Sequence, residues 1–276
     1  MKLAGIKQPK TPRKRAKQLP RPFIFVNMAM TADGKIATAN RAVSSFASPR
    51  DHEHLYELRA TADAVMCGAR TADLNKISLG TGGTKFQQQR LRRGLAEHNL
   101  RILVTGSGTL DPRAEIFRHH FSPIIILTTA RATQMKLARL RAVADEVKVC
   151  SQREINWPAT LRWLREKWKI KRLLCEGGGE LNAALFRGGL VDELHLTLCP
   201  KVFGGRNAPT ISDGGSVTRL ADAAQLELKS VEQAGEELFL VFRPTTKSKL
   251  RRHSVPHATD GSRPSGRSTR ARRQGG

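Results

Sequence analysis

The stretch that decides the fold is Leu173-Leu174-Cys175-Glu176-Gly177-Gly178-Gly179-Glu180-Leu181-Asn182. An apolar run ends in an acid, breaks into three glycines and resumes as an amphipathic pattern, which predicts a strand, a tight turn and a helix over residues 180–187. The amide groups and the positive dipole end of such a helix favour an anion. Glu176 stands at the carboxyl end of the strand, where open α/β sheets place their ligands.

The three consecutive glycines admit two interpretations. Because glycine has no Cβ, the backbone there can pass close to a ligand such as a phosphate or pyrophosphate. The spacing, however, matches neither the G-x-G-x-x-G of dinucleotide-binding folds nor the Gly-Lys-Ser/Thr of a P-loop. On the local pattern alone, the second interpretation therefore remains possible, namely a turn that only connects a strand to a helix and binds no ligand.

The charge of the chain is concentrated at its two ends. Of the formal charge of +24 over 276 residues, residues 1–21 carry +8 and residues 243–276 carry +9, which leaves +7 for the body. Both ends are rich in Pro, Ser, Gly, Lys and Arg, a composition that predicts disorder. We therefore expect basic tails at 1–21 and 244–276 around a folded domain at 22–243. Non-specific binding of polyanions is the activity that such tails suggest.

Cysteine usage and hydropathy indicate a reducing compartment. The cysteines (Cys67, Cys150, Cys175, Cys199) stand far apart at the ends of apolar runs, which predicts buried thiols rather than disulfides or a zinc site. We expect no metal site, because the histidines of the body show no metal-binding spacing. The sequence has no apolar run of about 18 residues and no apolar leader, so we expect no membrane span, no secretory signal and a cytoplasmic location.

Apolar runs alternate with helical patterns along the body, which predicts a mostly parallel central sheet with helices on both faces. The last two alternating segments, 225–232 and 237–242, predict an antiparallel hairpin at the C-terminal edge. The other predicted strands are residues 23–30, 64–67, 101–105, 123–128, 146–150, 171–176 and 193–199. The predicted helices are residues 48–59, 87–97, 131–142, 157–168 and 180–187.

Three blocks of sequence resemble the reductase domain of riboflavin biosynthesis, and they follow the order of that family over residues 22–243. The blocks are residues 27–37 (Asn-Met-Ala-Met-Thr-Ala-Asp-Gly-Lys-Ile-Ala, similar to S-x-D-G-K-I-A), residues 48–71 (S-P … L-R-A … A-D-A, then G-x-x-T), and residues 176–205 (E-G-G … G-L-V-D-E … P-K-x-F-G-G). The resemblance implies a dihydrofolate-reductase-like α/β fold. It further implies an NADPH-dependent enzyme, in homodimeric form, that reduces the ribosyl group of a phosphorylated 5-phosphoribosylamino-pyrimidine to ribityl.

The resemblance also assigns roles to individual residues. On the substrate side it places Arg59, as a clamp for a phosphate, with Glu176 and Leu79. Gly106 and Ser107 are expected near the 2′-phosphate side of the cofactor. The full set of expected cofactor contacts is Met30, Thr71, Asn75, Gly106, Ser107, Gly178, Gly179, Glu180, Leu181 and Asn182.

The chain departs from the family pattern in three places. Many members have Asp-Asp-Pro or Asp-Asn-Pro where this chain has Asn75-Lys76-Ile77, so the carboxylate expected there is missing. Ser44-Ser45-Phe46-Ala47 replaces the family's approach to Ser48. The H-x-E … P-C-x-x-C signature of the deaminase domain fused to many bacterial members does not occur, so the resemblance extends only to the reductase half of the pathway.

Two other functions compete with this reading. The first is reduction of another pterin-like or pyrimidine substrate, dihydrofolate included, although no acid is clearly placed on an early helix to protonate a pterin. The second is a nucleic-acid-binding protein that uses its tails and keeps the reductase fold as a scaffold. Whether a riboflavin precursor would be the deaminated uracil or the diamino-pyrimidinone also stays open.

Overall fold

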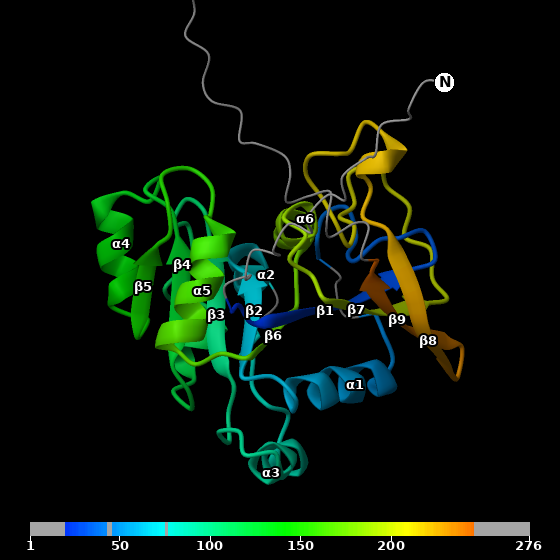
Figure 1. Ribbon diagram of the computed structural model, residues 1–276, viewed down its shortest axis with the longest axis horizontal. Coiled ribbons are helices and arrows are strands. Elements are labelled where there is room, and N and C mark those ends of the chain that lie inside the picture. The colour runs from blue at the N-terminus through cyan, green and yellow to red at the C-terminus, as the bar shows by residue number, and fades with distance from the viewer. Residues whose placement is uncertain (1–19, 43–45, 75–76, 246–276) are drawn as a thin grey trace, which may run out of the picture.

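The described part of the chain forms a single sheet of nine strands. The computed structural model describes residues 20–42, 46–74 and 77–245. The strand order is β5-β4-β3-β2-β6-β1-β7-β9-β8, and Figure 1 shows the sheet running from β5 at one side to β8 at the other. The strands are β1 (Phe23–Thr31), β2 (Ala64–Gly68), β3 (Leu100–Thr105), β4 (Ile124–Thr128), β5 (Glu146–Val149), β6 (Arg172–Cys175), β7 (Glu193–Cys199), β8 (Leu226–Ala234) and β9 (Glu237–Pro244).

The strands from β1 to β7 pair with one another in parallel. Ile24, Val26 and Met28 of β1 enter one core, whereas Phe25 enters the core on the opposite face. Since both faces are covered, such a strand is a continuous apolar run rather than an alternating one. The mostly parallel sheet predicted from the sequence is therefore confirmed.

Helices cover the two faces in two groups. Leu161 of α5 and Leu185 of α6 pack into the core that holds Ile24. Leu58 of α1 and Leu140 of α4 pack into the core on the other face. The helices are α1 (Pro49–Arg59), α2 (Ala69–Leu74), α3 (Thr84–Arg92), α4 (Gln134–Arg141), α5 (Trp157–Lys167) and α6 (Gly179–Arg187), with the 3₁₀ turns η1 (Glu115–Arg118) and η2 (Leu220–Asp222).

An antiparallel hairpin of β8 and β9 closes one side of the sheet, as predicted. β9 pairs with β7 on one side and with β8 on the other. β8 is the edge strand and is exposed along nearly its whole length. Its register shifts between Leu228 and Ser230, an irregularity of the kind that is common at sheet edges.

The predicted bounds of one helix were wrong. The sequence pattern placed that helix at residues 87–97, whereas α3 spans Thr84–Arg92. Gly83, with φ +100°, precedes the helix, and Gly94, with φ +69°, follows it. Both conformations lie in the left-handed region that favours glycine, so these two residues set the ends of the helix.

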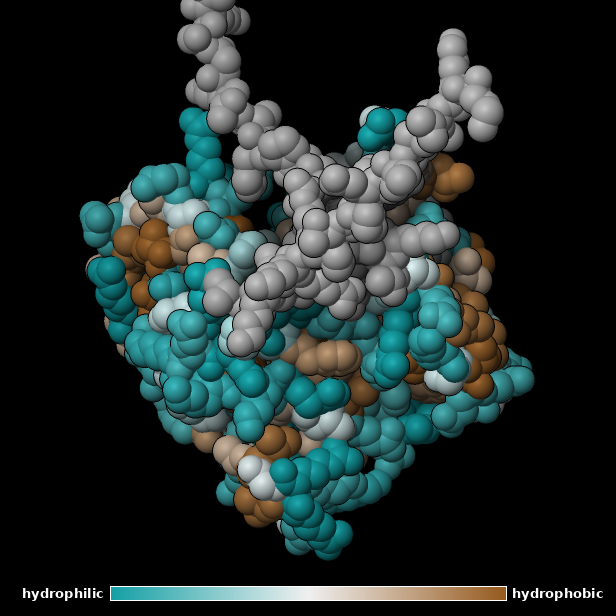
Figure 2. Space-filling model, viewed as in Figure 1, coloured by the Kyte–Doolittle hydropathy of each residue, from teal (hydrophilic) through white to brown (hydrophobic). Residues whose placement is uncertain are grey.

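The surface visible in Figure 2 is mostly hydrophilic, and its apolar side chains gather in separate patches. The most exposed large apolar side chains are Leu220 in η2 and Val202 in the segment after β7. Within residues 20–42, 46–74 and 77–245, no helix combines the length and the apolar character needed to cross a bilayer.

Arg90 of α3 is a buried cation that ties backbone segments together. Its Nη1 donates to the carbonyl oxygens of Arg59, at 2.8 Å, and Ala62, at 2.5 Å, and its Nε donates to that of Ala96, at 2.8 Å. Burial lowers the pKa of Arg90 to about 10. These bonds hold the C-terminal end of α1, and with it Arg59, in place beside the sheet.

Replacing Arg90 with leucine is expected to lower the free energy of unfolding by about 2–4 kcal/mol, because buried carbonyls lose a charged donor. Arg92→Leu, at an exposed position of the same helix, is the matched control and should change the free energy by less than about 0.5 kcal/mol. Urea unfolding measures both variants. Equal effects from the two would show that Arg90 does not anchor this region.

Candidate active site

The glycine turn, residues 177–179, follows β6 at the centre of the sheet. Cys175, the last residue of β6, pairs with Val26 of β1 on one side and Met66 of β2 on the other. The bonding continues beyond the strand, because the amide of Gly68 donates to the carbonyl of Gly177 at 2.7 Å. Gly177 has φ +78°, and a Cβ there would stand 2.7 Å from the sulfur of Met28, so this position requires glycine.

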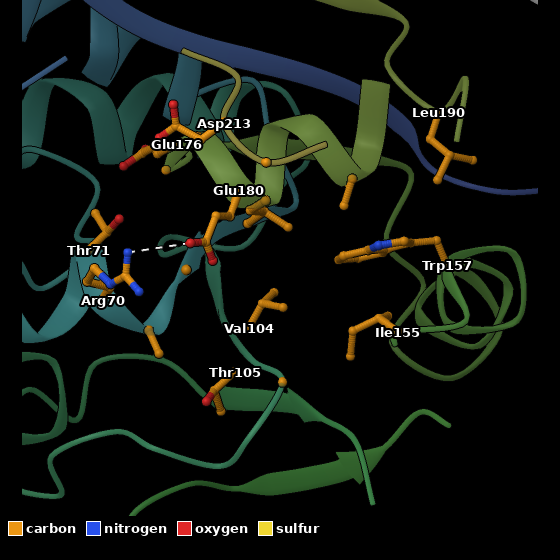
Figure 3. A pocket seen from close by; sticks show the side chains of 18 of the residues that line it. Arg70, Thr71, Val104, Thr105, Ile155, Trp157, Glu176, Glu180, Leu190 and Asp213 are labelled. Atoms are coloured by element: carbon orange, nitrogen blue, oxygen red, sulfur yellow. Dashed lines mark ion pairs between the residues drawn. The ribbon is translucent and has the colours of Figure 1, made fainter. Parts of the chain in front are cut away.

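The start of α6 faces the strand ends without a side-chain cap. Gly178 is the N-cap residue, and no side chain bonds to the first amides. The dipole of the helix and its first N–H groups therefore favour an anion at this point. Glu180 in the first turn forms an ion pair with Arg70 at 3.5 Å, and their side chains are 72% and 59% exposed. Figure 3 shows the two side chains reaching toward each other, with Thr71 beside Arg70.

A groove of about 1880 Å³ runs along the strand ends. Pockets for one small ligand measure about 300–1,000 Å³, so this groove has room for a dinucleotide and a second molecule together. It connects the region under α1 to the ends of β4 and β5. The predicted site residues that line it are Thr71, Gly106, Ser107, Glu176, Gly178, Gly179, Glu180 and Leu181.

Four other predicted residues within the described ranges are not among those that line the groove. Met30 packs beside the core of the α6 face, and Leu79 is buried in the opposite core with φ +55°. Asn182 turns inward, because its amide nitrogen donates to the carbonyl of Ile211 at 2.9 Å. Asn75 lies outside the described residues. Arg59, the fourth residue that does not line the groove, is bound to Glu176.

Arg59 and Glu176 form a buried ion pair between α1 and the glycine turn. Nε and Nη2 of Arg59 donate to the two carboxylate oxygens of Glu176, both at 2.7 Å, and Nη1 donates to the carbonyl of Gly80 at 2.5 Å. Burial alone would lower the pKa of Arg59, but the adjacent Glu176 carboxylate raises it above the ordinary value. In this geometry Arg59 orients the carboxylate that lines the groove, and its direct contact with a substrate phosphate stays a prediction.

The structure also brings residues to the groove that the sequence did not indicate. Asp51 of α1 and Trp157 of α5 both line the groove. Trp157 is largely buried as well, and Figure 3 shows it beside Ile155 and Leu190. No sequence spacing links these positions to the glycine turn, so only the fold reveals them.

Asp33, in the turn after β1, contacts a segment that is distant in the sequence. The carboxylate accepts hydrogen bonds from the hydroxyl of Thr31 at 2.5 Å and from the amides of Phe203 and Gly204. The Thr31 bond in particular lowers the pKa of Asp33. Asp33 thus joins the turn after β1 to the segment that follows β7.

The thiols near the groove are suited to packing rather than to nucleophilic chemistry. Cys67 and Cys175 are free and buried. Burial raises the pKa of Cys67 and brings the pKa of Cys175 to about 12, so both stay protonated at neutral pH. Within the described ranges, no group of three or more His, Cys, Asp or Glu side chains is arranged to hold a metal ion.

Known proteins are similar in sequence to this chain over most of its length. The model of the family described as RibD C-terminal domain matches residues 22–240. The chain is 33% identical over 224 residues to the 2,5-diamino-6-ribosylamino-4(3H)-pyrimidinone 5′-phosphate reductase of Methanothermobacter thermautotrophicus, which covers 80% of this chain and 98% of that protein. It is 27% identical over 228 residues to the riboflavin biosynthesis protein RibD of Actinobacillus pleuropneumoniae, of which it spans 57%.

Solved structures show the same fold. A pyrimidine reductase-like protein from Corynebacterium diphtheriae has a TM-score of 0.67 at 20% identity, with 81% of this chain and 92% of that chain covered. RibD of Acinetobacter baumannii has a TM-score of 0.64 at 20% identity, with 82% of this chain and 58% of that chain covered. The predicted dihydrofolate-reductase-like α/β fold is thereby confirmed. Since the family model spans most of the sequence and a relative of 33% identity aligns over nearly its full length, this chain belongs to the RibD C-terminal domain family.

Proposed function

We propose that this protein is an NADPH-dependent reductase of riboflavin biosynthesis, which converts the ribosyl group of a phosphorylated aminopyrimidine to ribityl. The observation that carries the proposal is the uncapped start of α6, which opens into a groove beside the Glu176 carboxylate at the centre of the sheet. The relatives named as pyrimidinone phosphate reductases supply the reaction class.

The residues along the groove fit a dinucleotide. Gly178 gives the backbone an open approach, because a Cβ there would meet only the hydroxyl of Thr71, at 3.5 Å. The first amides of α6 suit a pyrophosphate. At the far end, Ser107 lines the groove with Arg131 and Arg153, and these cations favour the 2′-phosphate that distinguishes NADPH from NADH. When bound, NADPH supplies the hydride that the sugar accepts.

The substrate lies, in this proposal, on the α1 side of the glycine turn. Glu176 presents its carboxylate there, held in one orientation by Nε and Nη2 of Arg59. Fixing the reacting carbon next to the cofactor is the main contribution that a protein makes to hydride transfer. We propose the 2,5-diamino-pyrimidinone phosphate as the substrate, because that compound stands in the names of the three relatives that this chain covers to 98%. Assembly as a homodimer, a cytoplasmic location and polyanion binding by the tails stay predictions.

The test is oxidation of NADPH by the purified full-length protein with each of two substrates, the diamino-pyrimidinone and the deaminated uracil form. We expect oxidation that depends on the pyrimidine, with NADPH used in preference to NADH. Reactions without pyrimidine are the control for background oxidation. Failure of both pyrimidines to support oxidation would refute the proposal.

A further inference from the structure

One face of α1 carries a row of groove residues. Asp51, Leu55 and Arg59 are spaced by four residues, so their side chains lie on the same side of the helix. Asp51 and Leu55 line the groove directly. Arg59, at the end of the row, contacts Glu176 beyond β6. The row therefore extends along α1 from Arg59, next to the glycine turn, to Asp51 near the opposite end of the helix.

That opposite end lies over β7 and β9. Ser48, the N-cap residue of α1, donates its amide and its hydroxyl to Glu237 of β9, at 2.9 Å and 2.6 Å. The hydroxyl of Thr197 on β7 faces the Asp51 carboxylate. Because β1 lies between β6 and β7, α1 crosses β1. Asn27 of β1 consequently lies beneath the helix, and it lines the groove too.

Two buried oxygens in this part of the groove have no hydrogen-bond partner. Asp51 is 7% exposed and Asn27 is 8% exposed, and Oδ1 of each lacks a donor. Among the ion pairs of the described residues, none includes Asp51, whereas Arg59 at the other end of the row is paired with Glu176. An unpaired buried acceptor is unfavourable, so these oxygens suit a ligand that brings N–H groups.

The charged groups around Asp51 do not compensate for the missing hydrogen-bond donor. Burial raises the pKa of Asp51, and the nearby Glu237 carboxylate raises it further, whereas Thr197 and the side chains of His54 and His52 oppose the increase. The protein thus holds a carboxylate at a place that disfavours its charge. A ligand with two adjacent donors would stabilise it.

We propose that Asp51 is a specificity-determining residue that binds the amino edge of the pyrimidine ring. This inference rests on the proposed function. A 2-amino-4(3H)-pyrimidinone has a ring N–H next to an amino group, and these two donors match the two oxygens of a carboxylate. In the deaminated uracil form an oxygen replaces the 2-amino group. The 2-oxygen and the facing carboxylate oxygen of Asp51 are then both hydrogen-bond acceptors and cannot bond to each other. Asp51 therefore selects the diamino substrate over the uracil.

The test compares wild type with Asp51→Asn on both substrates by NADPH oxidation, using the full-length protein. The amide of asparagine can donate to the 2-oxygen of the uracil. We expect kcat/KM for the diamino substrate to fall by about 10- to 100-fold, mostly through KM, with the uracil affected far less, so that the preference collapses or reverses. Glu57→Gln, the same kind of neutralisation at a more exposed position of α1, is the matched control and should keep the wild-type ratio.

Thermal unfolding separates recognition from a structural role. Because the carboxylate is buried without a cation, Asp51→Asn should keep or raise the Tm at pH 7. A clear drop in Tm, an equal loss on both substrates or an unchanged ratio would overturn the inference while the proposed function stands. Absence of NADPH oxidation by the wild type with either substrate would instead refute the proposed function and this inference with it.

Discussion

Replacing Arg59 with methionine, or Glu176 with glutamine, is expected to lower kcat/KM by about 100-fold or more and to destabilise the fold at the same time. Each substitution leaves the partner charge buried without compensation, which costs about 3–5 kcal/mol of stability. Arg59→Met also releases the groove-lining carboxylate from its fixed orientation, and a misplacement of about 1 Å is enough for a loss of about 100-fold. Glu176→Gln removes that carboxylate altogether. Steady-state NADPH oxidation and urea unfolding measure the two effects separately.

The double variant Arg59→Met/Glu176→Gln distinguishes a role of the ion pair in activity from a purely structural role. With both charges gone, the site regains most of the lost stability, because a buried pair replaced by neutral side chains is often no worse than the original. Activity should stay absent, since the groove then lacks its carboxylate. Recovery of activity together with stability would make the pair purely structural and would contradict substrate binding by Arg59 and Glu176.

Two surface substitutions control for the loss of charge itself. Arg92→Met and Glu166→Gln change the same residue types at exposed positions of α3 and α5. Both should leave turnover and stability close to those of wild type. A loss of activity in either control would show that net charge, rather than the buried pair, governs turnover.

Most of the sheet could be predicted because local patterns coincide with the tertiary environment. The run Phe23–Met30 is apolar except for Asn27 because both of its faces are covered. The segment Trp157–Lys167 repeats apolar residues on one side because one side meets the sheet. The hairpin of β8 and β9 has alternation that fits an edge with an open face. The bounds of α3 were missed because the left-handed glycines at 83 and 94, not the charge pattern, set its ends.

The site could be predicted where it is continuous in sequence and not where it is assembled across the fold. Gly178 to Leu181 follow one strand, so a short motif reveals them. The partnership of Arg59 with Glu176 joins residues that are 117 positions apart. The groove position of Asp51 depends on how α1 crosses β1, which no local pattern encodes. Asn182, next in sequence to a groove residue, turns inward because the helix rotates it toward Ile211.

Substituting alanine for Gly178 is expected to raise the dissociation constant for NADPH by about 10- to 100-fold while the Tm changes little. An added Cβ would stand 3.5 Å from the hydroxyl of Thr71, an ordinary contact, so the free protein accommodates it. In the proposed complex, the same methyl group would fill the space that the pyrophosphate occupies at the start of α6. Overpacking of this kind costs about 1–3 kcal/mol, and about 1.4 kcal/mol corresponds to a tenfold change in affinity. Isothermal titration with NADPH and thermal unfolding provide the two readings.

The adjacent substitution Gly179→Ala supplies the contrast that makes the result interpretable. A Cβ at Gly179 would stand 2.5 Å from the backbone carbonyl oxygen of Thr210 and 2.5 Å from Oδ2 of Asp213. Neither α6 nor the 210–213 segment can keep its position, so this variant should lose about 1–3 kcal/mol of stability even without ligand. The same one-carbon change is thus expected to weaken binding at 178 and folding at 179. If Gly178→Ala bound NADPH as tightly as wild type, the start of α6 could not be the pyrophosphate site, and the cofactor would have to cross the strand ends elsewhere in the groove.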